Sequence, residues 1–129
     1  MEQAIRVLVV DDEDDFRETL VKRLKARHFA AEGASSGDRA LALLETQTFD
    51  VIVLDVKMPG LDGIETLRRV KQQHPETAVI MLTGHASVEF GLQGMQLGAF
   101  DYMMKPAPID ALVDTIGQAF RKKSEAAPV

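Results

Sequence analysis

The sequence predicts one α/β domain built on a five-stranded, parallel β-sheet with helices on both faces. Three short apolar runs, at residues 6–10, 51–54 and 78–82, are rich in valine, isoleucine and leucine. Such runs are typical of strands that are buried on both faces of a parallel sheet. Segments with apolar residues at helical spacing separate them. The length of 129 residues suits a single domain of this kind.

Two weaker strands, at residues 29–34 and 99–104, are placed partly by their position in the alternation. Strict β-α alternation with right-handed connections predicts helices on both faces. At this length we expect the flavodoxin-like strand order 2-1-3-4-5. The helical apolar positions are Phe16, Leu20 and Leu24, then Leu41 and Leu44, then Ile64, Leu67 and Val70, and finally Ile109, Leu112, Val113, Ile116 and Phe120.

The remaining helix, from about residue 87 to 97, has an unusual composition. Gly91 and Gly94 lie inside it, and each costs about 0.5–1 kcal/mol relative to alanine in a helix interior. We expect Val88, Leu92 and Met95 to face the sheet, and the methionines other than Met1 and Met58 to belong to the core. The glycines fit either close packing against a neighbour or an element that moves, and the sequence leaves both open.

Composition excludes several classes of protein. Cysteine is absent, so neither disulfides nor thiolate chemistry is available, and a net charge of −5 argues against nucleic-acid binding by this segment. No apolar run is long enough to span a membrane, and the first residues do not resemble a signal peptide. We therefore expect a cytoplasmic protein, with a domain at residues 1–123 and a flexible tail or the start of a linker at 124–129.

Polar residues follow four of the predicted strands directly. Asp11 and Asp12 follow the first, Asp55 the third, Thr83 the fourth and Lys105 the fifth. Ligands of open α/β sheets bind outside the carboxyl ends of the strands. We therefore expect these side chains to meet in one shallow cleft.

Each of these residues also has an ordinary structural interpretation. Asp11, Asp12 and Glu13 suit the positive N-terminus of a following helix, and lysine is usually exposed. Their coincidence at four strand ends favours a site instead. Carboxylate ligands without cysteine or histidine suit Mg²⁺ (or Mn²⁺), and a carboxylate can be the nucleophile that becomes an aspartyl phosphate. Asp55, on the central strand, is the best candidate.

These residues resemble the receiver domains of bacterial response regulators in two-component signalling, over residues 5–122. The resemblance implies that Asp55 accepts the phosphoryl group, that Asp12 binds Mg²⁺ directly and that Asp11 acts mainly through water. The backbone carbonyl of Lys57 would be another metal ligand, and Lys105 would pair with the phosphoryl group. The matching segments are Val9–Glu13, Leu54–Gly63, Leu82–Ala86, and Gly98–Tyr102 leading to Lys105-Pro106.

The resemblance also implies a switch. Thr83 would move toward the phosphoryl oxygens, Tyr102 would turn inward, Gly84 would leave room for the phosphate, and the Lys105–Pro106 bond would be cis. A face formed by the fourth helix, fifth strand and fifth helix would then bind a partner or a second copy. The phosphoryl donor would be a sensor histidine kinase or a histidine phosphotransfer protein, and no turnover of free substrate is expected beyond the domain's own phosphorylation and dephosphorylation.

Lys57 and His85 lie two residues after Asp55 and Thr83, and the resemblance implies that these positions tune reaction rates. Lys57 is either a solvated surface lysine or a residue that interacts with the phosphoryl group or with His85. Because histidine titrates near neutral pH, we hypothesise that dephosphorylation depends on pH through His85.

Three other functions fit the chain less well. A haloacid-dehalogenase phosphatase would need an acid at position 57 and threonine at 59, where Lys57 and Pro59 stand. A flavin module would need a phosphate loop after the first strand, where acidic residues would repel phosphate. A receiver-like module that is never phosphorylated remains an alternative, disfavoured by the complete acidic set.

Overall fold

The computed structural model describes residues 3–56, 62–84 and 88–126 of the chain. Five strands and five helices alternate in these ranges, as the sequence predicts. The strands are β1 (Arg6–Val10), β2 (Ala30–Ala34), β3 (Val51–Leu54), β4 (Ala78–Thr83) and β5 (Asp101–Met104). The helices are α1 (Asp14–Ala26), α2 (Gly37–Thr46), α3 (Gly63–Gln73), α4 (Val88–Gln96) and α5 (Ile109–Ala126). Helical conformation thus continues into the segment 124–129.

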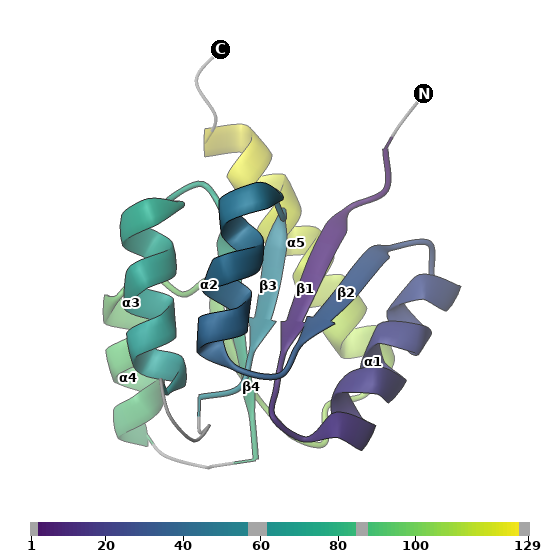
Figure 1. Ribbon diagram of the computed structural model, residues 1–129, viewed down its shortest axis with the longest axis horizontal. Helices are drawn as coiled ribbons and strands as arrows, with labels where there is room; N and C mark the ends of the chain where they lie inside the picture. Colours follow the sequence, from purple (N-terminus) through teal and green to yellow (C-terminus); the bar gives the residue numbers. More distant parts are fainter. Residues whose placement is uncertain (1–2, 57–61, 85–87, 127–129) are drawn as a thin grey trace.

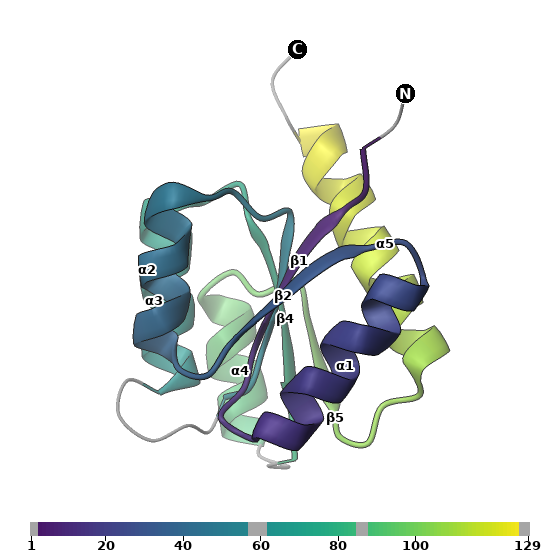
Figure 2. The same cartoon turned by 45° about the vertical axis from the view of Figure 1, so that its right-hand side comes forward.

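All strand pairs are parallel, and the sheet order is β2-β1-β3-β4-β5, which confirms the predicted topology. Helices α2, α3 and α4 cover one face, and α1 and α5 cover the other (Figure 2). The strands run in one direction, so their carboxyl ends share one edge of the sheet (Figure 1). Within the described ranges, no helix combines the length and the apolar composition needed to cross a bilayer.

Two apolar clusters lie on the two faces of the sheet, because successive strand residues point to opposite sides. In β1, Leu8 and Val10 pack toward α2 and α3, whereas Val7 and Val9 pack toward α1 and α5. The central strand β3 is completely buried. The strand that ends directly before Asp55 is therefore packed on both faces.

Helix α4 presents a different face to the sheet from the one predicted. Leu92 is 61% exposed and Met95 is 46% exposed, so the prediction that they face the sheet is wrong. A Cβ on Gly91 would lie 3.4 Å from the Tyr102 ring, and Gly94 packs against the Met81 side chain. Both glycines therefore lie on the inward face, and at Gly94 the absence of a side chain lets the helix approach Met81 closely.

Two methionines also depart from the prediction that they belong to the core. Met95 lies on the outer face of α4, and Met104, at the end of β5, is 47% exposed. Together with Leu92, they are the large apolar side chains exposed in the described part of the chain. Close packing against Met81 accounts for Gly94. A Cβ at Gly91 would be in ordinary contact with Tyr102, so packing does not account for that glycine, and the idea that this helix moves stays a prediction.

Candidate functional site

Backbone hydrogen bonds extend the sheet beyond the ends of its strands and bring the acidic residues together. The Asp11 N–H donates to the Ala34 carbonyl at 3.1 Å, and the Asp55 N–H donates to the Val10 carbonyl at 2.9 Å. Asp11 and Asp55 are both buried, and Asp12 is exposed. The end of β3 is therefore aligned with the end of β1, and two of the carboxylates are set into the sheet edge.

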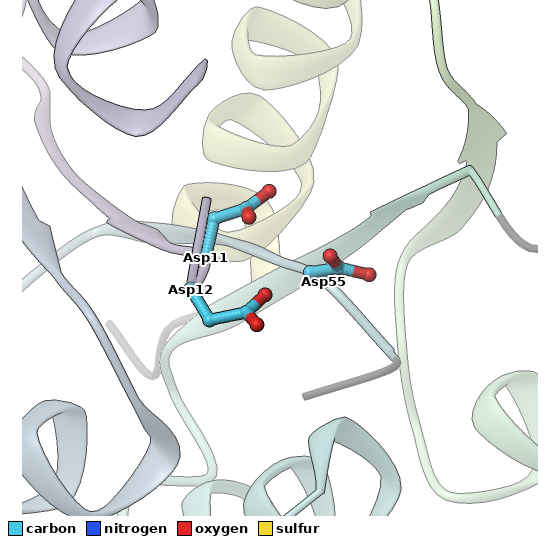
Figure 3. A group of neighbouring side chains, drawn as sticks. All are labelled: Asp11, Asp12 and Asp55. Atoms are coloured by element: carbon cyan, nitrogen blue, oxygen red, sulfur yellow. The ribbon is translucent and has the colours of Figure 1, made fainter. Parts of the chain in front are cut away.

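The three carboxylates form one cluster (Figure 3). One oxygen each from Asp11, Asp12 and Asp55 lies within 4.8 Å of the others. Such a set, made only of hard oxygen donors, is the kind that Mg²⁺ or Mn²⁺ binds. The residues thus fit a divalent cation in both spacing and chemistry.

Lys105 reaches into this cluster from the segment after β5. Its ammonium donates to Asp11 Oδ2 at 2.7 Å, to Glu13 Oε1 at 3.0 Å and to Asp55 Oδ2 at 3.4 Å. The same nitrogen lies 4.1 Å from the centre of the Phe16 ring. The lysine side chain is only 12% exposed. The predicted convergence of Lys105 with Asp11 and Asp55 is therefore present in the structure.

Burial and pairing act against each other on the charged groups. Burial raises the pKa of the Asp11 carboxyl above its ordinary value, and hydrogen bonds from Lys105 and the Glu13 N–H offset only part of that rise. For Lys105, burial by itself lowers the pKa. Hydrogen bonds to Asp11 and Glu13, with the charges of Asp11 and Asp55, outweigh this and raise the pKa above 10.5. The lysine is therefore fully protonated at neutral pH.

Thr83 lies on β4, next to the strand that precedes Asp55, and Tyr102 lies one strand further along, on β5. Thr83 is the last residue of β4 and is completely buried, and its carbonyl accepts a 2.9 Å hydrogen bond from the Lys105 N–H. Tyr102 lies in β5, half-buried against the apolar cluster that includes α2 and α3. Among the residues that the structure describes, none has an atom within 4 Å of the position that a Cβ on Gly84 would take. The Lys105–Pro106 peptide bond is cis, as predicted.

Two predicted site residues, Lys57 and His85, lie outside the described residues. The predicted metal contact of the Lys57 carbonyl and the predicted effects of Lys57 and His85 on rates therefore stay predictions.

Sequence reasoning missed three neighbours of the site. Glu13 binds Lys105 and makes no side-chain capping hydrogen bond at the start of α1. Phe16 lies against the Lys105 ammonium as well as in the core. Arg17 donates to the Asp11 carbonyl at 2.9 Å and pairs with Asp14 at 2.8 Å. The only feature of the sequence that points to a role for Glu13 in the site is its place directly after Asp12. An acidic residue at the start of a helix is common, so this place does not distinguish Glu13.

Comparison with known proteins agrees with this geometry. Residues 7–117 match the response regulator receiver domain family. The chain is 36% identical over 117 residues to the DNA-binding transcriptional regulator NtrC of Klebsiella pneumoniae, covering 91% of this chain and 25% of that protein. It is 35% identical over 119 residues to the regulatory protein AtoC of Escherichia coli, covering 92% and 26%. The chain thus spans about a quarter of the length of these curated relatives.

Solved structures show the same architecture. A CheY-like response regulator receiver domain protein from Methanospirillum hungatei JF-1 superposes with a TM-score of 0.93 at 27% identity, covering 97% of this chain and all of that one. NtrX from Brucella abortus, solved in complex with ATP, has a TM-score of 0.89 at 32% identity, covering 95% of this chain and 28% of that chain.

Fold, site and comparisons together define a phospho-accepting signalling domain of two-component systems. The chain belongs to the response regulator receiver domain family, and its curated relatives include NtrC and other transcriptional regulators.

Proposed function

We propose that Asp55 is the phospho-acceptor of this receiver domain. The observation that carries the proposal is the arrangement around Asp55: an ammonium 3.4 Å away and two further carboxylates in the same cluster. A carboxylate oxygen of Asp55 forms a bond to the phosphorus of the donor. The bond from phosphorus to the donor breaks, and its electron pair leaves with the imidazole of a phosphohistidine or with acetate from acetyl phosphate.

The acidic cluster supports a divalent cation as cofactor, Mg²⁺ or Mn²⁺. Asp12 and Asp55 are the proposed direct ligands, with the backbone carbonyl of Lys57. Both Asp11 oxygens already accept hydrogen bonds, one from the Glu13 N–H and one from Lys105, which supports an indirect role through water. When bound, the cation offsets negative charge on the transferring phosphoryl group.

The protein's own groups supply the rest of the stabilisation. Lys105 is the proposed cationic partner of the phosphoryl oxygens, and its burial makes that contact stronger than it would be in water. Thr83 is the proposed hydroxyl donor, because it ends the strand next to Asp55. Its carbonyl also accepts a hydrogen bond from the Lys105 N–H, which places the two residues together. Such preorganised donors act mainly on the charge that develops during transfer.

The proposed output surface lies on α4, β5 and α5. Phosphorylation adds negative charge and strong acceptor oxygens, which biases the position of Thr83 and of Tyr102. The Tyr102 ring lies beside α4, 3.4 Å from the position that a Cβ on Gly91 would take, so a movement of the ring would change the packing of that helix. Leu92, Met95 and Met104 expose apolar area on α4 and β5, which suits a protein partner or a second copy of this domain.

We propose that this domain acts in the cytoplasm and that its upstream partner is a sensor histidine kinase or a histidine phosphotransfer protein. Relatives such as NtrC are DNA-binding transcriptional regulators of about four times this length. A role in controlling transcription would therefore require segments other than the one described.

Labelling by a small phosphodonor tests the proposal. The protein is incubated with acetyl phosphate and Mg²⁺, and intact mass is followed for the wild type, Asp55→Ala and the matched control Asp50→Ala. One phosphoryl group per chain in the wild type and the control, and none in Asp55→Ala or with chelator, is the expected result. No adduct in the wild type would favour a receiver-like module that is never phosphorylated, and sustained release of phosphate from added phosphoesters would favour a phosphatase.

A further inference from the structure

The ammonium of Lys105 has no spare donor. An ammonium group carries three N–H donors, and three carboxylates surround it: Asp11 at 2.7 Å, Glu13 at 3.0 Å and Asp55 at 3.4 Å. Phe16 occupies a further side, 4.1 Å from the nitrogen. A new acceptor in the site can therefore bind Lys105 only if one of these carboxylates gives up its contact or shares it.

Glu13 is the carboxylate best suited to release. Asp11 makes the shortest contact and is nearly fully buried, and Asp55 is the proposed acceptor itself. The Glu13 side chain is 64% exposed, so water can solvate its carboxylate once Lys105 leaves. An ion pair with one exposed partner is also weak enough to exchange.

Within the described ranges, the Glu13 side chain has no hydrogen bond or ion pair other than the one with Lys105. It stands at the N-cap of α1, where serine, threonine, aspartate and asparagine are preferred, and makes no side-chain capping hydrogen bond. The backbone of Glu13 does the structural work, since its N–H donates to Asp11 and its carbonyl accepts from the Arg17 N–H. Its carboxylate is directed to Lys105 instead.

We propose that Glu13 is a positioning residue for Lys105: its carboxylate holds the ammonium while Asp55 is unmodified and releases it when a phosphoryl group arrives. The inference rests on the proposed function, because it concerns the same site. Glu13 and the phosphoryl oxygens compete for one N–H donor, and Phe16 limits where that donor can go. Glu13 thereby opposes phosphorylation and weakens the binding of phosphoryl mimics.

The first test is made on the unphosphorylated protein and needs no phosphoryl chemistry. Reductive methylation of Lys105 is followed by peptide mass spectrometry in the wild type, Glu13→Gln and Asp15→Asn. Asp15 is an exposed acid two residues away for which no contact with Lys105 is seen, so its variant removes an equal charge without the contact. Methylation of Lys105 is expected to be roughly two- to fivefold faster in Glu13→Gln, the range of an exposed ion pair, and close to wild type in Asp15→Asn.

The second test measures the consequence for the reaction. With acetyl phosphate and Mg²⁺, Glu13→Gln is expected to label about two- to fivefold faster than the wild type and Asp15→Asn, and to bind beryllofluoride more tightly by a similar factor. In a Lys105→Gln background, the Glu13→Gln substitution should change the labelling rate no further, because its partner is gone. A merely structural role for Glu13 would not show this dependence on Lys105.

The outcomes separate this inference from the proposed function. The inference is wrong if Glu13→Gln matches Asp15→Asn in both tests. It is also wrong if Glu13→Gln speeds labelling as much in the Lys105→Gln background as in the wild type. In both cases Asp55 can still be the acceptor. If the wild type takes no label, the proposed function fails. Equal methylation of Lys105 in the wild type, Glu13→Gln and Asp15→Asn would in addition overturn the proposal that Glu13 holds Lys105. Faster methylation and faster labelling in Glu13→Gln alone support the inference.

Discussion

Replacing Gly63 with alanine tests how closely the start of α3 packs against the backbone of Asp55, the proposed phospho-acceptor, and of Val56. A Cβ at Gly63 would lie 2.5 Å from the Val56 Cα and 2.7 Å from the Val56 carbonyl oxygen, and closer still to the Asp55 carbonyl oxygen. These are backbone atoms, so no side-chain rotation relieves the overlap. The Gly63 N–H also donates to the Val56 carbonyl at 2.8 Å, which fixes the approach.

Two opposing effects set the expected magnitude. Overpacking in a close-packed region costs typically about 1–3 kcal/mol, and backbone contacts favour the upper end of that range. Alanine in place of glycine also raises the free energy of unfolding by about 0.5–1 kcal/mol through its higher helix propensity. The free energy of unfolding is therefore expected to fall by about 2 kcal/mol, and phosphorylation of Asp55 is expected to slow because its backbone must shift.

Urea unfolding measures the effect, with Gly117→Ala in α5 as the matched control. The nearest atom to a Cβ at Gly117 is the Arg121 guanidinium at 3.3 Å, the far end of a flexible side chain. That variant should gain about 0.5–1 kcal/mol. A Gly63→Ala protein as stable as the wild type, with an unchanged denaturant slope, would refute the close-packing argument.

Three further perturbations follow from single contacts. Asp62→Ala removes the N-cap of α3, whose side chain accepts from the Glu65 N–H at 2.8 Å, and is expected to cost about 1 kcal/mol in urea unfolding. Lys71→Met removes two hydrogen bonds to backbone carbonyls after α3, at 2.9 and 3.0 Å, and a loss of about 1–2 kcal/mol is expected; no loss would show that water replaces them. The pKa of Lys105 is raised above 10.5 in the folded state, so its stabilising contribution is complete below that pH and is lost as pH rises through the folded-state value. The difference in unfolding free energy between wild type and Lys105→Met should therefore narrow above pH 10.5. A difference that stays constant would contradict the pairing of Lys105 with the carboxylates around it.

The sheet order and most of the site follow from local patterns in the sequence. The segments 7–10 and 51–54 are apolar throughout, which distinguishes buried parallel strands from surface strands. A polar residue directly after such a strand must lie at the carboxyl edge of the sheet, so Asp11, Asp55 and Lys105 could be brought together without a structure. Strand direction together with the expected strand order carries that inference.

The features that could not be predicted depend on contacts between distant residues or on backbone proximity. The Glu13–Lys105 pair joins residues 92 positions apart, and nothing near Glu13 distinguishes it from an ordinary helix-start acid. In α4, the apolar residues Leu92 and Met95 suggested an inward face, but the close approach at Gly94 decided the orientation. A pattern of apolar side chains cannot show where a missing side chain is the requirement.

The most direct test of the account is to locate the phosphoryl group chemically. The protein is phosphorylated with acetyl phosphate and Mg²⁺, then treated with borohydride, whose hydride reduces the acyl carbon of an aspartyl phosphate to an alcohol as phosphate leaves. Peptide mass spectrometry should find homoserine in place of aspartate at position 55 in the phosphorylated sample alone, with Asp11, Asp12 and Asp62 intact. Unmodified Asp55 in a protein that had taken up one phosphoryl group, or reduction at another aspartate, would contradict the assignment of Asp55 as the acceptor.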